Sequence, residues 1–463
     1  MNYRPLSDAD LLQVFERSEK PASEWRVGLE VERFGFTLEG HPLPYEGQTS
    51  VTSLLQWLQK ERGWEPHSEV PGGPILALER GTASVTLEPG GQVELSGAPH
   101  STVHAVAEEY QAHLAELRAA GDAIGAWFAH VGFHPTARLE QLTWVPKRRY
   151  PIMREYLPTR GARGRDMMQR TATVQVNLDY ASEADAMHKL LVLSRLTPLI
   201  QALTINAPFI EGRRSALKSE RLDVWLNMDP ARSGLLLDLW KKPTPRYSDY
   251  VEWALDAGMF LFVRDGEVMR NTGQTFRDFR ANGFQGHHAT EEDWRLHLGT
   301  LFPEVRLKST LEIRCCDCVP PPLTYAVPAL LVGLAYDAEA LDKASAIADR
   351  IDAKAAVALQ RQVAERGLNA KLDGVLLQQL CVELIEFAQA GLVRRARRDG
   401  HGHDEAVYLE PLMALATKGL SPADLVIAEV ATAKQSDASS NLLGALRAAW
   451  DEAAPVGPQG GQR

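Results

Sequence analysis

The chain is poor in cysteine, and the few that it has are not spaced for a framework of disulfide bonds. Of 463 residues only four are cysteine: Cys315, Cys316 and Cys318 stand together, and Cys381 lies far along the chain. Small secreted proteins that depend on disulfides carry many more cysteines at regular spacings. The pattern excludes that class and agrees with a reducing compartment.

Long apolar runs are also lacking. No stretch approaches the roughly 20 consecutive apolar residues that a helix needs to span a bilayer. The first residues, "MNYRPLSDADLLQVFERSEK", mix charged and apolar residues and do not contain the apolar core of a signal peptide. We therefore expect no membrane association and a cytoplasmic location.

Positive charge is in deficit, with 50 lysines and arginines against 60 aspartates and glutamates and a net charge of −10. Because nucleic-acid binding needs a cationic surface, we expect no nucleic-acid partner. The basic stretch at 393–405, "VRRARRDGHGHDE", could instead be a nucleic-acid or membrane patch. It closes a long helical pattern, where cations complement the helix dipole, so we predict a solvated helix end with a stop at Gly400.

The pattern of apolar and polar residues differs between the first and the last part of the chain. Up to about residue 320, short alternating segments mix with helical patterns at 101–131, 183–203 and 291–301, whereas from about residue 322 the pattern is almost wholly helical. We expect an α+β sheet region over 1–320 and a mostly helical region over 321–453, packed on the same unit. The last residues, 454–463, are rich in proline, glycine and glutamine, and we expect them to be disordered.

The alternating segments predict strands that each have one polar face, because successive side chains of a strand point to opposite sides. "WRVGLEVERFGF" places Glu30 and Glu32 on one face, and "SVTLEPGGQVELSG" predicts a hairpin that turns at 89–91. The polar positions of the hairpin and of two further segments, "TATVQVNLDY" and "STLEIRCCDC", are Glu88, Glu94, Gln175, Asn177, Glu312 and Arg314. Alternation favours an antiparallel sheet over a doubly wound parallel one.

If these strands pair, five carboxylates crowd one surface: Glu30, Glu32, Glu88, Glu94 and Glu312. Like charges this close raise each other's pKa and destabilise the fold unless cations lie between them. Ligands made only of oxygen suit a hard cation such as Mg²⁺ or Mn²⁺ better than zinc. The alternative is a merely acidic, solvated surface, since strand pairing cannot be observed in one sequence.

Several long motifs, rich in uncommon residues, follow one another along residues 25–415. They read "EVERFGFTLEGHPLPYEG", "TLEPGGQVELSGAP", "DMMQRTATVQVNLDY", "DYVEWALDAGMF", "TGQTFRDF", "DWRLHLGTLFPEVRLK" and "LEIR". In that order they resemble the segments of the glutamate–cysteine ligase family of the plant and proteobacterial type. Chance agreement of so many long motifs is far less expected than agreement of one short motif.

The resemblance implies a fold like the catalytic domain of glutamine synthetase, with a curved antiparallel sheet forming a funnel and helices packed outside it. It also implies a reaction that needs ATP and Mg²⁺. In that reaction the γ-carboxylate of glutamate is phosphorylated and the amine of cysteine attacks the acyl phosphate, which is the first step of glutathione biosynthesis. The sheet region over 1–320 would then be catalytic.

Carried over by position, the resemblance assigns roles to the polar face. The five acids would ligate the metal ions, and Gln175 and Asn177 would lie beside them at the nucleotide. Arg314, with Glu312 next to it, would be catalytic and would neutralise charge on the transferring phosphoryl group. An arginine suits this role because its planar guanidinium binds two oxygens at once.

Two other segments add weaker candidates. In "LKSERLDVWLNMDPARSGLL" the resemblance makes Arg221, Trp225 and Arg232 contacts of the amino-acid substrate; alternatively, the arginines are surface cations and the tryptophan belongs to the core. In "REYLPTRGARGRDMMQR" the glycine-bearing loop around Arg163 could close over ATP phosphates, or it could be an ordinary mobile surface loop.

The stretch "RCCDC" departs from the family, which usually has small, glycine-containing residues after the arginine. Arg314 and Asp317 are kept. The cysteine spacing matches no common four-ligand zinc site, so small buried fillers are favoured over a zinc or redox role.

The substrate is less certain than the fold, because fold does not determine which amine is accepted. The leading hypothesis joins glutamate to cysteine. Its alternatives are a ligase for another amine and an inactive relative that binds a nucleotide or an amino acid. Partners would be these small molecules only, and the chain would be a monomer or a homodimer.

Overall fold

A computed structural model describes residues 5–432 and 438–452. Within them, nine strands form one sheet: β1 (Val27–Thr37), β2 (Glu65–His67), β3 (Ala77–Arg80), β4 (Ala83–Leu87), β5 (Val93–Ser96), β6 (Ala126–Ala129), β7 (Thr173–Leu178), β14 (Val305–Leu307) and β15 (Leu311–Asp317). Their order is β14-β15-β7-β1-β5-β4-β3-β2, with β6 beside the far end of β1. Every neighbouring pair is antiparallel, and the sheet is open.

Alternation explains how each central strand sits in the sheet. Val27, Leu29 and Val31 of β1 are buried in the core, while Glu30 and Glu32 emerge on the opposite face. The predicted hairpin is confirmed: β4 and β5 pair on either side of the turn at 89–91. β1, the longest strand, forms the middle of the sheet because it pairs with β5 on one edge and β7 on the other.

Helices make up most of the rest of the molecule. They are α1 (Asp8–Glu16), α2 (Val51–Arg62), α3 (Val103–Ile124), α4 (Tyr150–Tyr156), α5 (Gly164–Arg170), α6 (Glu183–Thr204), α7 (Glu220–Leu226), α8 (Leu237–Trp240), α9 (Tyr247–Asp256), α10 (Phe276–Asn282), α11 (Glu291–Gly299), α12 (Leu323–Ala335), α13 (Ala338–Ala348), α14 (Ala353–Arg366), α15 (Leu377–Arg395), α16 (Glu410–Thr417), α17 (Pro422–Thr432) and α18 (Ala438–Glu452). Short two-stranded sheets join β8 (Phe209–Ile210) to β9 (Arg213–Arg214), β10 (Ser233–Gly234) to β13 (Phe302–Pro303), β11 (Leu261–Arg264) to β12 (Glu267–Arg270), and β16 (Lys371–Leu372) to β17 (Val375–Leu376).

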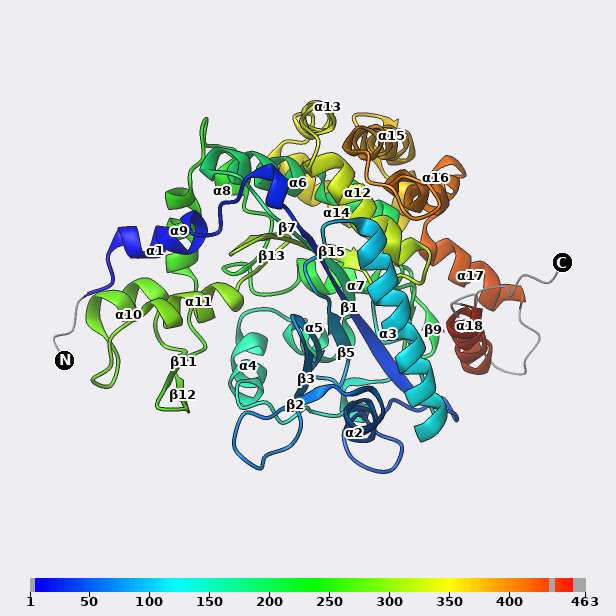
Figure 1. Cartoon of the computed structure of the whole chain (residues 1–463), viewed down its shortest axis with the longest axis horizontal. Helices are drawn as coiled ribbons and strands as arrows, with labels where there is room; N and C mark the ends of the chain where they lie inside the picture. Colours follow the sequence, from blue (N-terminus) through cyan, green and yellow to red (C-terminus); the bar gives the residue numbers. More distant parts are fainter. Residues whose placement is uncertain (1–4, 433–437, 453–463) are drawn as a thin grey trace.

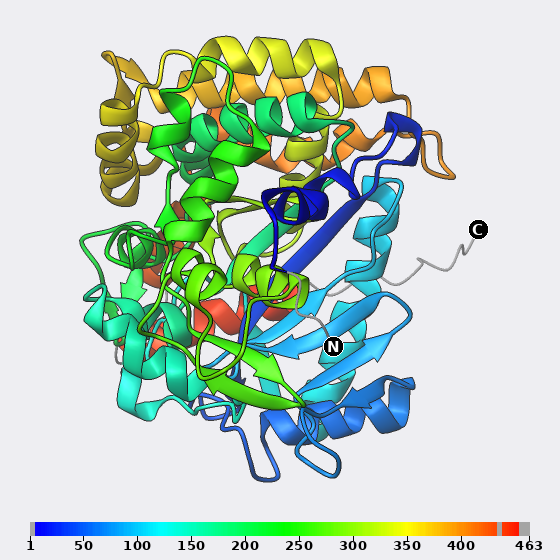
Figure 2. The same ribbon diagram turned by 90° about the vertical axis from the view of Figure 1, so that its left-hand side faces the viewer.

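The apolar face of the sheet is covered by helices from distant parts of the chain. α3 and α12 contact β1, α12 also contacts β7, and α6 contacts β15. Figures 1 and 2 show α3 alongside the sheet and α12 to α16 gathered at one end of the molecule. The α+β class with an antiparallel sheet and outer helices is therefore confirmed. In the described part of the chain no helix is long and apolar enough to cross a membrane.

Two of the three predicted helices in the first part of the chain are confirmed nearly to their ends. The patterns at 183–203 and 291–301 correspond to α6 and α11, whose first turns are capped by Ser182 and Thr290. The pattern at 101–131 is wrong in its last seven residues, since α3 stops before Gly125, which takes a left-handed conformation with φ 74°. The apolar residues that follow form β6 instead.

The predicted stop at Gly400 is also wrong. α15 ends at Arg395 and its cap, Ala396, has a φ of 52°. Two of the four arginines in this basic stretch form ion pairs: Arg394 pairs with Asp337, and Arg395 pairs with Glu405. The stretch thus starts as a helix end whose last two arginines have carboxylate partners. The expected disordered tail at 454–463 lies outside the described residues, and the division of the chain near residue 320 stays a prediction.

Candidate active site

A cavity of about 500 Å³ lies over the polar face of the sheet. Its floor is formed by β1, β4, β5, β7 and β15, and its walls by α4, α5, α7 and α11. The polar lining from the sheet and the hairpin turn includes Glu30, Glu32, Thr86, Glu88, Gln92, Glu94, Thr173, Gln175 and Arg314. This volume is in the range of small-molecule sites in proteins.

Strand register brings the acids together. Glu32 lies directly opposite Glu94 on β5, and Glu30 lies opposite Gln175 on β7. Burial, with Glu312 and Glu94 nearby, raises the pKa of Glu30 to about 7. Burial and neighbouring acids likewise raise the pKa of Glu94, and raise that of Glu32 well above its usual range. These carboxylates repel one another as the sequence pattern predicted.

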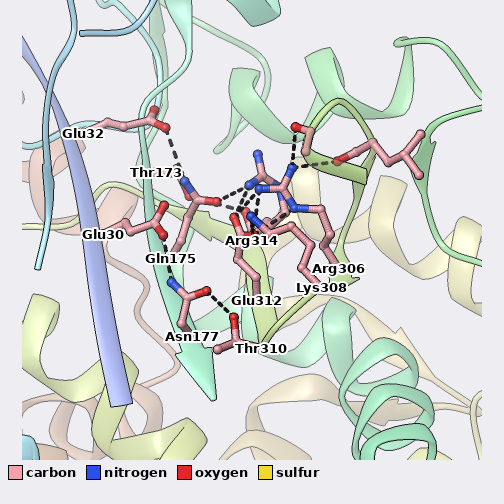
Figure 3. Close-up of polar contacts among 12 residues, drawn as sticks. Glu30, Glu32, Thr173, Gln175, Asn177, Arg306, Lys308, Thr310, Glu312 and Arg314 are labelled. Carbon is pink, nitrogen blue, oxygen red and sulfur yellow. Dashed lines mark hydrogen bonds and ion pairs between the residues drawn. The ribbon is translucent and has the colours of Figure 1, made fainter. Parts of the chain in front are cut away.

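Glu312 is in the opposite situation, as Figure 3 shows. Its two oxygens accept hydrogen bonds of 2.8 and 2.7 Å from Arg306, and Lys308 Nζ lies 3.1 Å away. Arg314 forms a third ion pair with it. Burial alone would raise the pKa of Glu312, but these three cations hold it well below its ordinary value. The three cations therefore favour the ionised form of Glu312 and hold its carboxylate in place.

Two amide side chains link the repelling acids to this ion cluster (Figure 3). Asn177 donates from Nδ2 to Glu30 over 2.8 Å and accepts from the Thr310 hydroxyl over 2.9 Å. Gln175 donates from Nε2 to Glu32 over 3.4 Å, and its Oε1 accepts from Arg314. The amides thus orient both acids, and Gln175 also holds the arginine at the cavity.

The donor set fits a hard divalent cation in its chemistry. Glu30, Glu32, Glu88 and Glu94 line the cavity, and within the described ranges none of them forms an ion pair, so their oxygens need positive charge. Nowhere in residues 5–432 and 438–452 are three or more His, Cys, Asp and Glu side chains already arranged around one metal position. Glu312 fits a metal less well, because Arg306 and Lys308 occupy its oxygens.

Of the residues expected at the substrate, two reach the cavity. Arg221 and Trp225, both on α7, line it. Arg232 is absent from the lining: its side chain is completely buried, pairs with Asp229 at 2.9 Å, and donates to the backbone carbonyls of Gly258 and Thr300.

The loop arginine Arg163 is also absent from the lining. It precedes α5 and is held by three acids: Asp166 at 2.6 Å, Asp223 at 2.7 Å and Glu220 at 3.5 Å. Its guanidinium therefore ties α5 to α7. This arrangement supports the wall of the cavity from behind.

The cysteines of the "RCCDC" stretch are fillers. Cys315, Cys316 and Cys318 are buried and free, as is Cys381. Burial raises the pKa of the Cys318 thiol to about 12, so it is not a thiolate at neutral pH. The interpretation as small buried side chains is confirmed.

Sequence reasoning missed several cations at the site, among them Arg295 of α11, which lines the cavity. Arg306 and Lys308 alternate in "VRLK", immediately before the "LEIR" strand, and this period of two could have identified them as neighbours of Glu312. Lys147 and Arg149 line the cavity on the side of Glu88. Lys147 donates to the carbonyl of Leu87 over 2.7 Å. Lys147 and Arg149 come from an irregular segment, in which no repeating pattern of apolar and polar residues indicates which side chains face the cavity.

An open antiparallel sheet that presents buried acids and a fixed arginine to a cavity of this size is typical of an enzyme that binds a small molecule. The particular family follows from comparison with known proteins. Residues 26–446 match the model of the glutamate-cysteine ligase family 2 (GCS2), and the chain belongs to this family. The resemblance seen in the motifs is confirmed.

Curated plant proteins are similar over most of the chain. "Glutamate--cysteine ligase, chloroplastic" of Brassica juncea is 37% identical, over 91% of this chain and 80% of its own length. "Glutamate--cysteine ligase B, chloroplastic" of Oryza sativa subsp. japonica is 36% identical, over 91% of this chain and 84% of its own. Among solved structures, the glutamate–cysteine ligase of Francisella tularensis in complex with AMP has a TM-score of 0.57 at 13% identity, covering 94% of this chain and 89% of that one. That structure shows the shared fold.

One expectation is contradicted by these comparisons. A cytoplasmic location was inferred from the cysteines and the first residues, but the curated plant relatives are named as chloroplastic. Members of this family are thus named for another compartment. The inference of a cytoplasmic location is wrong, because neither feature distinguishes a cytosolic enzyme from one that works in a different reducing compartment.

Proposed function

We propose that this protein joins the γ-carboxylate of L-glutamate to the amine of L-cysteine at the expense of ATP, through an acyl phosphate. Family membership and the relatives named glutamate–cysteine ligases support this reaction class. The structural observation that supports this reaction most strongly is the position of Arg314. Glu312 and Gln175 hold its guanidinium at the cavity, beside acids for which the described residues provide no ion-pair partner.

We propose that Glu30, Glu32, Glu88 and Glu94 are ligands of the metal. Glu312 is a further proposed ligand, provided that Arg306 and Lys308 release one of its carboxylate oxygens when the metal binds. Mg²⁺, or Mn²⁺ in its place, supplies charge that neutralises the phosphates of ATP. The chain's own part is to keep these oxygens dry and close together. The raised pKa values of Glu30, Glu32 and Glu94 mean that a cation and the ionised forms of these carboxylates stabilise each other.

For Arg314 and Glu312 we propose catalytic roles. A guanidinium fixed by two partners stabilises charge that develops on the transferring phosphoryl group, without having to reorient during the reaction. Glu312 and Gln175 each accept a hydrogen bond from that guanidinium. We propose that Gln175 and Asn177 lie beside the bound nucleotide, where Asn177 also orients Glu30. A lysine would reach fewer oxygens and would lose the bond to Gln175 or to Glu312.

For substrate binding we propose Arg221 and Trp225, since both line the cavity. The guanidinium of Arg221 lies over the Trp225 ring, 5.7 Å from its centroid, which makes a surface with one charged and one apolar part. Contact of Arg232 with substrate, or of Arg163 with the nucleotide, remains part of the proposal. Each would require that arginine to leave its carboxylate partners.

The test measures phosphate release from ATP and Mg²⁺ with glutamate, with and without cysteine, and identifies the product by mass spectrometry. We expect γ-glutamylcysteine only when cysteine is present. Glutamate-dependent release without this dipeptide would point to another amine, which a panel of amines would identify. No release under any condition would contradict the proposal in favour of an inactive binding relative, and the mass of the native particle decides between monomer and homodimer.

A further inference from the structure

The strand that carries Arg314 is irregular at this residue. Ile313 of β15 lies opposite Val176 of β7, but the next aligned pair is Cys316 with Val174, so three steps along β15 match two along β7. Arg314 and Cys315 thus occupy a β-bulge. Bulges change the direction of a side chain and occur often beside active sites. This one presents Arg314 to the cavity.

A bulge leaves backbone carbonyls without their partners in the ladder, and buried carbonyls need donors. Here side chains supply them. Arg221 donates to the carbonyl of Arg314 over 2.8 Å and to that of Cys315 over 3.3 Å. Thr173 donates from its hydroxyl to the carbonyl of Cys316 over 2.6 Å. Arg221 therefore holds the two residues of the bulge from outside the sheet.

Asp317, the last residue of β15, in turn holds Arg221. Its Oδ1 lies 3.5 Å from Arg221, and its Oδ2 accepts from the backbone N–H of Asn206 over 2.7 Å and from the hydroxyl of Ser219 over 2.8 Å. Ser219 also caps α7, the helix on which Arg221 is the second residue. One carboxylate thus joins the end of β15, the start of α7 and the guanidinium that holds the bulge.

The carboxylate has no freedom to move. Asp317 is 2% exposed, and a Cβ added at Gly132 would come within 2.5 Å of its Cγ. The glycine backbone lies directly against the carboxylate and leaves room for no larger residue. Asp317 does not line the cavity, so it cannot act on a substrate directly.

We infer that Asp317 is a positioning residue: it orients Arg221, which holds the bulge that presents Arg314 to the cavity. This inference rests on the proposed role of Arg314 in the ligase reaction. The cysteines fill space around the bulge, and the carboxylate sets its geometry.

The first variant is Asp317→Asn, which keeps the size of the side chain but removes its charge. Its matched control is Asp179→Asn. Asp179 directly follows β7, is also 2% exposed, accepts a backbone N–H from Arg26 over 2.7 Å, and pairs with Lys20 at 2.8 Å, but it lies outside the cavity lining. A loss of stability common to buried acids would affect both variants alike.

We expect Asp317→Asn to lower kcat roughly tenfold or more, with less change in the KM for ATP, because a small displacement of a catalytic group has large effects on rate. Asp179→Asn should keep the kcat of the unchanged protein. Amide hydrogen exchange of β15, followed by mass spectrometry, should be faster in Asp317→Asn and unchanged in the control. If Asp317→Asn does not fold, Ser219→Ala removes one partner of the carboxylate and should lower kcat less.

A kcat near that of the unchanged protein, or normal exchange in β15, would overturn the inference. A kcat that falls equally in Asp179→Asn would do so as well, since it would show a general loss of stability. If the unchanged protein itself has no ligase activity, the proposed function fails, and the exchange of β15 still decides whether Asp317 holds the bulge.

Discussion

The charge of Glu312 is the feature of the site that a single substitution tests best. Its side chain is 1% exposed and meets Arg306, Lys308 and Arg314, whose side chains are 8%, 32% and 14% exposed. Glu312→Gln keeps the shape of the residue and removes the one negative charge that all three cations share. In the part of the chain that the structure describes, Arg306 and Arg314 form ion pairs with no other carboxylate.

Removal of one partner of a buried ion pair costs about 3–5 kcal/mol, because the other charge is left buried and alone. Lys308 is partly solvated and recovers some of this loss, so we expect Glu312→Gln to lower the free energy of unfolding by roughly 3–4 kcal/mol. An ordinary domain has roughly 5–15 kcal/mol, so the variant should still fold. Its kcat should fall as well, since Arg314 loses one of the two groups that hold it.

Urea unfolding without Mg²⁺ at neutral pH measures the loss. The surface variant Glu339→Gln, which breaks ion pairs with Lys343 and Arg394, is the control and should change little. The double variant Glu312→Gln with Arg306→Gln should be less destabilised than the sum of the two single variants, by about 1 kcal/mol or more.

The pH dependence has a definite sign. Because the pKa of Glu312 lies well below 4.5 in the folded state, its contribution to stability is present above pH 4.5 and is lost only as the pH falls through that lower value. The difference between the unchanged protein and Glu312→Gln should therefore persist from pH 8 to about 4.5. Additive single variants, or a loss below about 1 kcal/mol, would refute the reasoning.

Three further results are expected from the site. Burial and nearby acids raise the pKa of Glu30 from 4.5 to about 7, so the folded protein keeps a proton that the unfolded chain has lost, and stability should fall as the pH rises between these values. Mg²⁺ should therefore raise Tm more at pH 8 than at pH 5.5, and an equal rise at both would contradict this. Arg314→Lys should lower kcat by about 100-fold, and a normal kcat would argue against its role. Ellman's reagent should find no fast-reacting thiol in the native protein and four after denaturation, because all four cysteines are buried.

The sequence predicted the strands of the site because their signal is local. An alternation of apolar and polar residues decides which side chains share a face, and β1, β7 and β15 follow it. The turn at 89–91 joins two alternating segments so closely that only a hairpin is possible. The acids of the polar face could therefore be identified from the order of the residues alone.

Other features could not be predicted from the sequence, because they depend on neighbours distant along the chain. β6 is a strand only because β1 offers it an edge, although the same residues continue a helical pattern. Arg232 and Arg163 resemble ligand-binding arginines in the sequence, but Asp229 and the acids around α5 engage them away from the cavity.

The sequence by itself determined the class of fold, the family and the polar face of the sheet, since periodicity and long motifs are properties of the chain alone. Only the tertiary structure decided how charge is distributed on that face. Within the described residues Glu312 forms ion pairs with three cations, whereas Glu30, Glu32 and Glu94 form none and are buried beside other acids; the pKa of Glu312 is therefore lowered and the pKa values of the other three are raised. The physical reason is that electrostatic energy depends on distance and burial, which strands far apart in the sequence acquire only when they pair.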